Sequence, residues 1–498
     1  MYSKFQAHQI QNFSMFVFFF LVVAASLGCS SQTEQTDTLS PPSEHQPPTT
    51  SPTNIPDQPA PPAPDELPSI SPAPEGSLSS QGPWFVFSGP GSLWALNADG
   101  SGLTQIADEV VKWNRDWTSG VSPSGGHVAY ISGQDDFYNL ALNIYSFQSD
   151  ESRLITPLVS PELEPDPDVT FERVEAIESI AYFDSLAWSP DGSQLAFIGA
   201  LDGLSSDLYI YLLADGSIIR LTDGPSQAYQ LSWSPDGKNI LHYGVETFGT
   251  GAGYALTGTY AARADDSGII TLSGPFSGDE IVVGWLDARS AVVYSWSPSC
   301  EVHDLHSLNI ETSAETMLFA GPFRDAVMEP ASGSIIVLVS ESSDFCAQDA
   351  GQGLHLIPRG GSPFHLLKDK PSGVLWSPDA GQFFARTEFG VVAVSTAGDW
   401  VPLETLTGKY PAANPLDKSL AWYGGDSGLW LSPFQVTPDG PQPQQVFDQR
   451  VLFASWDPSG QYLLFMGEDY VSVLHRPSMQ IFTVAEGVGG RVGVWVNP

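Results

Sequence analysis

Three recurring features of this 498-residue sequence predict an all-β fold built as a single large β-propeller. The phrase Trp-Ser-Pro-Asp-Gly begins at Trp188 and again at Trp233, and Trp-Ser-Pro-Asp begins at Trp376. A hydrophobic strand follows each copy, as it also follows looser copies at Val121 and Ser455. The copies are separated by roughly the forty to fifty residues of one propeller blade.

The phrase has the chemistry of a tight turn. Proline presets its φ angle, aspartate bonds its own backbone and glycine accepts a positive φ, so each copy predicts the corner of a β-hairpin. In the clearest unit, residues 182–224, two further strands follow the hairpin and complete a four-stranded sheet. Such a sheet cannot bury both of its faces alone, and stacking the copies around a ring solves this.

Weaker copies extend the same pattern around Trp285, Met328 and Asn414. One copy is divided between the chain ends: residues 491–498 (RVGVWVNP) supply a first strand, and three further strands begin at Pro83. Pairing of these ends closes the ring and removes its open edges. We count nine copies and expect eight or nine four-stranded blades over residues 83–498.

The repeated phrase resembles the repeat of TolB-type propellers, which also occurs in the propeller domains of prolyl oligopeptidases. The resemblance extends over residues 83–498 and is strongest at Trp188, Trp233 and Trp376. It implies a binding or scaffolding propeller rather than a named partner. We expect neither the α/β domain that precedes the TolB propeller nor the hydrolase domain of the peptidases.

The N-terminal residues 1–28 have the features of a signal peptide. Lys4 lies in a short polar head, and residues 15–28 (MFVFFFLVVAASLG) form an apolar run that is short for a membrane span. Cys29 follows directly, and SLGC resembles the bacterial lipoprotein signal, although Ser26 stands where leucine is usual. We therefore expect lipidation at Cys29. The alternative is an ordinary secretory signal followed by an incidental cysteine.

The next segment, residues 29–82, is rich in Ser, Thr, Gln, Pro and acidic residues and contains almost no large apolar side chains. This composition cannot form a core and predicts a disordered linker. About fifty such residues reach on the order of 100 Å if stiff and roughly half of that if flexible. A tether between a lipid anchor and a folded head accounts for this length.

The two other cysteines, Cys300 and Cys346, follow the predicted second strands of consecutive units. Equivalent loops of adjacent blades lie side by side, so we expect a disulfide between them in an oxidising compartment. Two unrelated buried thiols are the alternative.

The charge of the chain is strongly acidic, with 57 Asp and Glu against 19 Lys and Arg and a net charge of −38. This charge argues against nucleic-acid binding, because neutralising phosphates requires a basic face, and it argues equally against electrostatic attachment to anionic lipid. Solubility outside the cell explains the charge best, and a preference for cationic partners or metal is the alternative.

The sequence contains no GxSxG, HExxH or CxxC motif and no phosphate-binding loop. His303 and His306 lie beside Cys300, but residues three apart on a strand face opposite sides, so only a bent loop brings the imidazoles together. We expect no catalytic residue, no metal site and no cofactor.

An acidic stretch between the second and third units offers carboxylates for Ca²⁺: Glu162, Glu164, Asp166 and Asp168. The prolines among them predict an extended, solvated loop rather than one that wraps an ion.

Tryptophans fall mostly at one position, the end of the first strand of a unit, which indicates packing between blades: Trp188, Trp233, Trp285, Trp376, Trp456 and Trp495. Others lie outside this position and are better candidates for a binding surface: Trp113, Trp117, Trp400 and Trp430.

These features favour an exported protein, lipid-anchored on the outer side of a bacterial membrane in the periplasm or at the cell surface. We expect a monomeric, non-enzymatic binding or scaffolding propeller whose partner is an envelope protein or peptide. The alternative is a carbohydrate-active propeller, an enzyme or sensor of glycosidase or uronate lyase type. That alternative requires carboxylates or histidines from several blades at one channel mouth. A structural spacer in an envelope complex is a third option, and loops from many blades set the ligand.

Overall fold

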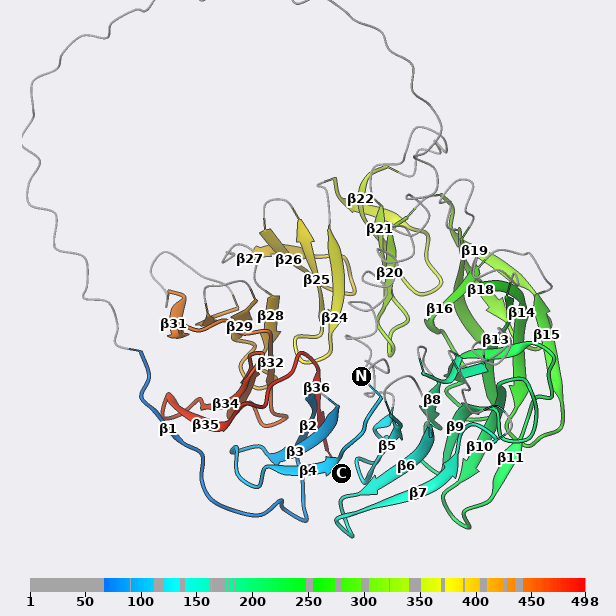
Figure 1. The fold of residues 1–498 in the computed structure, drawn as a ribbon. Coiled ribbons are helices and arrows are strands. Elements are labelled where there is room, and N and C mark those ends of the chain that lie inside the picture. Colours follow the sequence, from blue (N-terminus) through cyan, green and yellow to red (C-terminus); the bar gives the residue numbers. More distant parts are fainter. Residues whose placement is uncertain are drawn as a thin grey trace, which may run out of the picture. The chain divides into compact units, whose positions relative to one another are not determined.

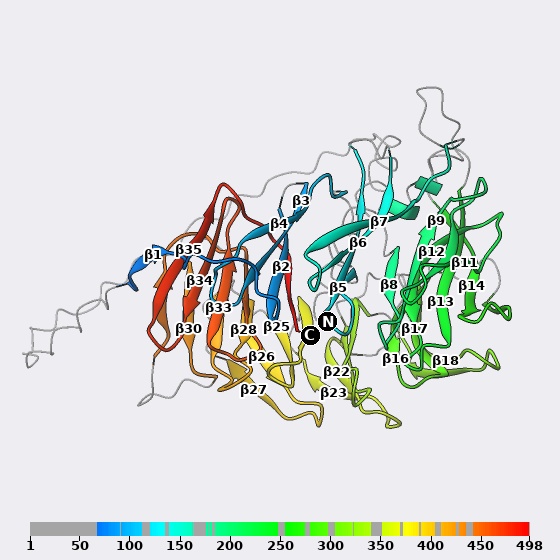
Figure 2. The same ribbon diagram turned by 90° about the horizontal axis from the view of Figure 1, so that it is seen from below.

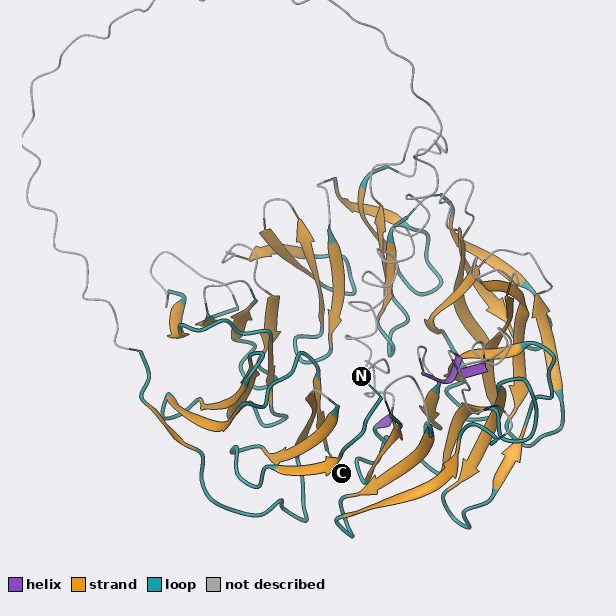
Figure 3. Cartoon of the chain, viewed as in Figure 1, coloured by secondary structure: helices purple, strands orange, loops and turns teal. Residues whose placement is uncertain are grey.

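Nine β-sheets follow one another in the computed structural model and form a nine-bladed β-propeller (Figure 1). Strands make up nearly all of its regular structure (Figure 3), and Figure 2 shows the same blades after a turn of 90°. The structure describes residues 67–89, 91–111, 120–134, 139–161, 163, 176–177, 179–181, 185–247, 254–273, 279–296, 304–321, 323–339, 351–368, 372–387, 390–403, 410–424, 428–434 and 442–497. The count of nine confirms the prediction of eight or nine blades.

The first four blades contain these strands, given in spatial order. Blade 1 has β36 (Gly493–Val496), β2 (Trp84–Gly89), β3 (Ser92–Asn97) and β4 (Thr104–Ala107). Blade 2 has β5 (His127–Ser132), β6 (Ala141–Ser146) and β7 (Glu151–Pro157), and an isolated bridge between Val121 and Val128 stands in the place of its first strand. Blade 3 has β8 (Leu186–Trp188), β9 (Gln194–Gly199), β10 (Asp207–Leu212) and β11 (Ile218–Arg220). Blade 4 has β12 (Gln227–Trp233), β13 (Asn239–Thr247), β14 (Tyr254–Arg263) and β15 (Ile269–Ser273).

The remaining blades repeat the four-stranded order. Blade 5 has β16 (Asp279–Trp285), β17 (Ser290–Trp296), β18 (Asp304–Asn309) and β19 (Glu315–Phe319). Blade 6 has β20 (Asp325–Met328), β21 (Ile335–Val339), β22 (Gly353–Ile357) and β23 (Phe364–Leu367). Blade 7 has β24 (Gly373–Ser377), β25 (Gln382–Thr387), β26 (Gly390–Val394) and β27 (Trp400–Leu403). Blade 8 has β28 (Tyr410–Ala413), β29 (Leu420–Tyr423), β30 (Leu429–Ser432) and β31 (Gln444–Phe447). Blade 9 has β32 (Phe453–Trp456), β33 (Tyr462–Met466), β34 (Tyr470–His475), β35 (Gln480–Glu486) and the added β1 (Ile70–Pro72).

The Ser-Pro-Asp-Gly phrase forms the corner between the first and second strands, as predicted. In blade 3 the carbonyl oxygen of Ser189 accepts the N–H of Gly192 at 2.8 Å, and Gly192 has a φ of 71°. The Ser189 hydroxyl donates to Asp191 at 2.6 Å and accepts the N–H of Gln194 at 3.0 Å. The side chains therefore close the turn from both sides, and Ser234 and Asp236 repeat the arrangement in blade 4.

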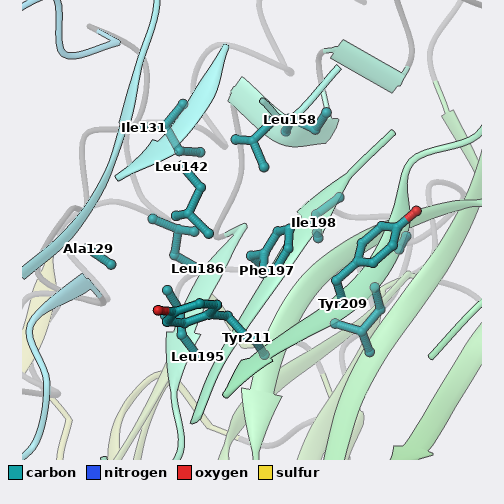
Figure 4. Packing of buried hydrophobic residues seen from close by; sticks show 14 of the residues in the cluster. Ala129, Ile131, Leu142, Leu158, Leu186, Leu195, Phe197, Ile198, Tyr209 and Tyr211 are labelled. Atoms are coloured by element: carbon teal, nitrogen blue, oxygen red, sulfur yellow. The ribbon is translucent and has the colours of Figure 1, made fainter. Parts of the chain in front are cut away.

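Apolar side chains fill every junction between neighbouring blades. Eight hydrophobic clusters within the described residues span the nine junctions, and the largest joins blades 2, 3 and 4. Figure 4 shows part of it, with Ile131 and Leu142 of blade 2 gathered with Leu186 and Phe197 of blade 3. Each fully buried side chain of this kind contributes about 1.5–3 kcal/mol. The faces that one sheet leaves uncovered are buried by its neighbours.

The tryptophans at the ends of the first strands lie in these junctions, which confirms the packing role predicted for them. In four blades the indole N–H also donates a hydrogen bond to the first-strand region of the preceding blade. The bonds run from Trp188 to Gly120 O (2.7 Å), from Trp233 to Ala187 O (2.9 Å), from Trp285 to Ser232 Oγ (2.9 Å) and from Trp456 to Ala412 O (3.2 Å).

The two ends of the propeller meet in blade 1, as predicted. Strand β36 pairs antiparallel with β2, with Trp495 opposite Phe85 and Gly493 opposite Phe87. The C-terminal strand therefore becomes the innermost strand of a blade whose other strands come from the start of the folded unit. This pairing closes the ring without an open edge between its ends.

The folded unit begins at Pro68, ahead of the start expected at Pro83. Strand β1 lies parallel to β35, the outer strand of blade 9, with Ile70 opposite Ile481. The N–H of Ala73 donates to Thr483 O at 2.9 Å. The last part of the segment predicted as linker thus covers the outer edge of one blade. No helix among the described residues is long and apolar enough to cross a membrane.

Candidate functional site

Most side chains singled out from the sequence lie outside the described residues: Cys29, Trp113, Trp117, Glu162, Glu164, Asp166, Asp168, Cys300, His303 and Cys346. The lipidation, the disulfide and the acidic loop therefore stay predictions. His306 is described on β18, where its Nδ1 lies 4.0 Å from Glu315 Oε2. Within the described part of the chain, no three His, Cys, Asp or Glu side chains are grouped as a metal site would require.

The two described tryptophans that were candidates for a binding surface lie on different blades. Trp400 begins β27, the outer strand of blade 7, and is 44% exposed. Trp430 lies on β30 of blade 8 and packs against the cluster between blades 7 and 8. Trp400 therefore remains a surface candidate, whereas Trp430 belongs to the packing.

In every blade the first strand begins, and the second strand ends, at the same end of the ring. We name this end the first-strand rim, and several arginines lie at it. Arg324 precedes β20, Arg386 is near the end of β25, and Arg450 and Arg491 precede β32 and β36. These four residues, the arginine rim, come from blades 6, 7, 9 and 1. They are four of only 19 basic residues in the chain, and acidic residues such as Asp325 and Glu468 stand at the same end of the strands.

Arg386 and Tyr410 are the best-defined contact of this rim. The guanidinium carbon of Arg386 lies 4.2 Å from the centre of the Tyr410 ring, which is a cation–π contact between blades 7 and 8. Nη2 of Arg386 is buried and has no hydrogen-bond partner. Tyr410 is 46% exposed. A fixed arginine with an unsatisfied donor thus lies beside an accessible aromatic ring.

Arg220 in blade 3 shows how this chain treats an arginine whose role is structural. Its guanidinium pairs with Asp202 at 3.2 Å, with Asp207 at 2.7 Å and with Asp223 at 2.6 Å. Asp207 is almost completely buried, so this charge is neutralised within the fold. Arg386, by contrast, forms no ion pair with any described carboxylate.

Aromatic rings continue from Arg386 across blades 8, 9 and 1. Tyr410 lies 5.9 Å from Tyr423, Tyr423 lies 6.3 Å from Phe453, and Phe453 lies 5.9 Å from Phe85, measured between ring centres. Burial, and then the neighbouring Tyr410, raise the pKa of Tyr423 to about 12. Its phenol therefore stays neutral near pH 7 and can donate a hydrogen bond.

Arg450 and Arg491 share a single carboxylate. Arg450 Nη1 lies 3.8 Å and Arg491 Nη2 lies 3.2 Å from Glu468 Oε1, and all three side chains are more than half exposed. Exposed pairs of this kind contribute about 0–1 kcal/mol to stability. Asp469 follows Glu468 directly and Asp448 lies two residues before Arg450, so acidic side chains accompany the two arginines in the sequence.

Asp325 adds a buried carboxyl group beside Arg324. It begins β20, and its Oδ2 has no hydrogen-bond partner. Burial raises the pKa of Asp325 to about 7. A carboxyl group that titrates near neutrality is the type of group that acid–base catalysis uses.

Reasoning from the sequence missed this rim, although the repeat contained a signal for part of it. Arg324 and Arg491 both stand four residues before the first-strand position that holds Met328 and Trp495. Arg386 lies within a second strand, where an arginine in the sequence usually indicates a solvent-exposed side chain. Only its neighbours in space show that its charge is unpaired.

The arrangement suits recognition of an anionic group that is joined to an apolar one. The Arg386 guanidinium supplies the positive charge, and the exposed ring of Tyr410 offers an adjoining aromatic surface.

Comparisons with known proteins support the fold but do not assign the chain to a family. No protein-family model matches the sequence. The uncharacterized peptidase YuxL of Bacillus subtilis (strain 168) is 46% identical over 54 residues, which are 11% of this chain. The chain thus spans only 8% of the length of that curated relative.

Solved structures resemble the chain at low sequence identity. The eukaryotic initiation factor aligns with a TM-score of 0.53 at 13% identity, over 84% of this chain and 99% of its own. The propeller domain of the Trilobed protease from Pyrococcus furiosus aligns with a TM-score of 0.38 at 11% identity, over 73% of this chain and 96% of its own. Propellers associated with peptidases are thus among the neighbours, and the likeness extends to the fold alone.

Proposed function

We propose that this chain is an exported, lipid-anchored binding propeller that recognises an envelope protein or peptide at its first-strand rim. The observation that carries the proposal is the contact of Arg386 with Tyr410, in which two blades hold a guanidinium that pairs with no described carboxylate beside an accessible ring. Blades 6, 7, 8, 9 and 1 all contribute to the same rim, so the surface is wide enough for a polypeptide.

The sequence supports the same function from the other end of the chain. The apolar residues 15–28, Cys29 and the proline-rich linker are the features of a tethered lipoprotein. The resemblance of the repeat to TolB-type propellers supports the class of binding propellers. A binding head on a tether can reach partners at a distance from its membrane.

Site-specific cross-linking tests the binding surface. A photo-reactive amino acid replaces Tyr410 in the full chain, and in a matched variant it replaces Arg289, which lies in the corner between β16 and β17 at the opposite rim. We expect a discrete adduct in bacterial cells from position 410 and none from position 289. Equal labelling from both positions, or none from position 410, contradicts the proposal.

The anchor is tested separately by replacing Cys29 with Ser. We expect the wild-type protein in the membrane fraction and Cys29→Ser in the soluble exported fraction or retained with an uncleaved signal. A variant that fractionates with the membrane as a processed protein contradicts the lipid anchor but leaves the binding surface untouched.

A carbohydrate-active enzyme is a second candidate, and Asp325 is the observation that favours it. This buried carboxyl group with an unpartnered Oδ2 lies at the same rim as the arginines. If the chain cleaves acidic polysaccharide, Asp325→Asn should abolish release of oligosaccharides, whereas Asp207→Asn should leave any turnover in correctly folded protein unchanged.

A further inference from the structure

We propose that residues 68–79 form a strap that detaches from blades 9 and 1 when the linker before them is pulled, while the ring itself stays closed. This proposal rests on the proposed tethered function, because an anchored chain that holds a partner puts its linker under tension. Its basis is the way in which the strap is held, by a few hydrogen bonds and without a buried side chain.

The first step is the position of the strap at the junction where the ring closes. Figure 1 shows β1 beside β35 of blade 9, and the N–H of Ile481 donates to Ser69 O at 3.1 Å. Further along, Asn97 of blade 1 donates to Ser77 O at 3.0 Å and accepts the N–H of Ser79 at 2.9 Å. The strap therefore connects the outer strand of blade 9 to the β3–β4 corner of blade 1, whereas β36 closes the ring at its innermost strand.

The second step is that the strap is held less firmly than the ring. All of residues 68–79 are described, and none of them is buried. Ile70 is 56% exposed, and Leu78 packs only at the edge of the cluster between blades 1 and 2. By contrast, Val496 of β36 and Phe85 of β2 are almost completely buried. Buried apolar surface is the main source of stability in a fold, so the strap should detach under a smaller load than β36.

The third step is the path that a load takes. Pro68 is the first residue of the strap and the start of the folded unit, so a pull on the linker reaches the strap before it reaches any blade. Full extension of residues 68–79 would lengthen the tether by up to about 40 Å. The ring would stay closed, because the pairing of β36 with β2 does not involve the strap.

The fourth step explains why blade 9 needs a cover. Among the outer strands that the structure describes, β7 and β35 are the longest, with seven residues each. Exposed Glu151 and Arg153 lie on β7, and such charges keep an edge from pairing with another chain. No charged residue precedes Glu486 on β35 (QIFTVAE), so its edge is suited to pairing.

The prolines of the strap fit this covering role. Ser69 and Ala73 bond to β35, so odd-numbered residues face that strand and even-numbered residues face outward. Pro72 of β1, like the flanking Pro68 and Pro74, is even-numbered and has no N–H to offer a further strand. The strap thus covers one edge without creating another, and its detachment exposes the edge of β35 while the linker is under tension.

Optical tweezers test the strap on the full chain in detergent. The handles are attached through reactive amino acids that replace Thr38 in the linker and the exposed Thr316 on β19 of blade 5. We expect a first extension step of up to about 40 Å, at a lower force than the unfolding of the ring and reversed when the force is relaxed. Loss of the strap and the ring in a single step, or the absence of an early step, overturns the proposal.

Two variants assign the early step to the strap. Asn97→Ala removes both hydrogen bonds of Asn97 to the strap and should make the step about tenfold faster at constant force. Asn309→Ala is the matched control, because Asn309 ends the third strand of blade 5 as Asn97 ends that of blade 1, but it bonds within its own corner. It should leave the early step unchanged, and equal effects of the two variants overturn the assignment.

A covalent lock gives the opposite change. Ser71 and Phe482 lie opposite each other on β1 and β35, so a disulfide in the double variant Ser71→Cys, Phe482→Cys ties the strap to blade 9. The early step should disappear in the molecules that mass spectrometry shows to be linked, and it should return with reductant. The wild type in the same reductant controls for the native cysteines. An early step that persists in the linked molecules contradicts the proposal.

The outcomes separate the strap from the proposed function. The handles apply the load themselves, so the measurement does not depend on lipid at Cys29. If Cys29→Ser stays in the membrane as a processed protein, the anchor fails and an early step still supports a releasable strap. If Cys29→Ser leaves the membrane but the strap and the ring open together, the anchor stands and the strap proposal fails.

Discussion

The indole N–H of Trp233 donates a hydrogen bond of 2.9 Å to the carbonyl oxygen of Ala187, the residue before Trp188 on the first strand of the preceding blade. Trp188 makes the same contact with Gly120 in its own preceding blade. In the four blades that have this hydrogen bond, the repeated tryptophan is thus a directional link to the preceding blade as well as an apolar group in the junction.

Replacing Trp233 with Phe should therefore cost more than the loss of ring area alone. The variant leaves the carbonyl oxygen of Ala187 without its partner, and we expect a further loss of about 1–2 kcal/mol in the free energy of unfolding. Trp495→Phe is the control, because Nε1 of Trp495 is buried without a hydrogen-bond partner. Urea unfolding of both variants measures the difference, and equal losses would show that the hydrogen bond contributes nothing.

Deleting residues 491–498 should destabilise the whole ring. It removes β36 and exposes the edge of β2, the strand that pairs with it. We expect a cooperative fall in Tm of more than about 10 °C. Deleting residues 68–74 removes β1 instead, and it should lower Tm by only a few degrees because β1 covers an outer edge. If the C-terminal deletion melts like the wild type, β36 does not close the ring.

Gly353→Ala should be among the most damaging small substitutions. Gly353 has a φ of 130°, and a Cβ atom there would lie 1.8 Å from the carbonyl oxygen of Leu367 on the adjacent strand. Gly268 has nearly the same φ, 135°, but open space around it. Gly268→Ala should lose about 1–2 kcal/mol from the backbone conformation, and Gly353→Ala at least about 2 kcal/mol more. Chemical denaturation compares them, and similar losses would mean that the blade adjusts to the added methyl group.

His242 should make the fold sensitive to acid. Burial lowers the pKa of His242 to about 4, and its ring stacks on Tyr260 with 5.4 Å between ring centres. Below pH 6.5 the unfolded chain binds a proton that the folded chain takes up only near pH 4. Stability is therefore full above pH 6.5 and falls by about 3 kcal/mol on the way to pH 4.

His242→Phe keeps an aromatic ring at this position and cannot titrate. Measuring the free energy of unfolding of both proteins between pH 4 and pH 7.5 should show a shallower acid slope for the variant. Parallel slopes would assign the acid sensitivity to other groups.

A disulfide between Cys300 and Cys346 stays a prediction, because both residues lie outside the described part of the chain. The second strands that precede them, β17 and β21, belong to the adjacent blades 5 and 6. Closing a loop of about 46 residues would stabilise the protein by roughly 4 kcal/mol. Peptide mapping without reductant should recover the two cysteines in one linked peptide, and free thiols in protein exported by its native host would rule the bond out.

The fold could be predicted from the sequence wherever the residues of the repeat have a fixed role in the turn. The corner gives a fixed role to each of Ser189, Asp191 and Gly192, so their order in the sequence predicts a turn. In blade 8, Asn414 stands at the serine position and reaches Gly460 O of the next corner at 2.8 Å, which preserves the junction with a different residue. Such substitutions explain why the weaker copies were harder to count.

The pairing of β1 and the surroundings of Arg386 depend on residues that are distant in sequence. The repeat pattern therefore could not predict them. The residues of β1 have no strand-like alternation, and they pair because β35 offers a free outer edge. Arg386 resembles any strand arginine until the ring places Tyr410 beneath it, with no carboxylate of the described residues in an ion pair with it. The candidate site was therefore missed although the strands that build it were foreseen.

Blade 1 is assembled from both ends of the propeller sequence, and this has a consequence for the order of synthesis. Strands β2, β3 and β4 are synthesised before all strands of blades 2 to 8, yet their partner β36 follows the last strand of blade 9. Until those final residues exist, β2 presents an unpaired edge that chaperones and proteases can recognise. Blade 1 therefore forms only in a product that contains both β2 and β36, and a product truncated before β36 keeps its exposed edge.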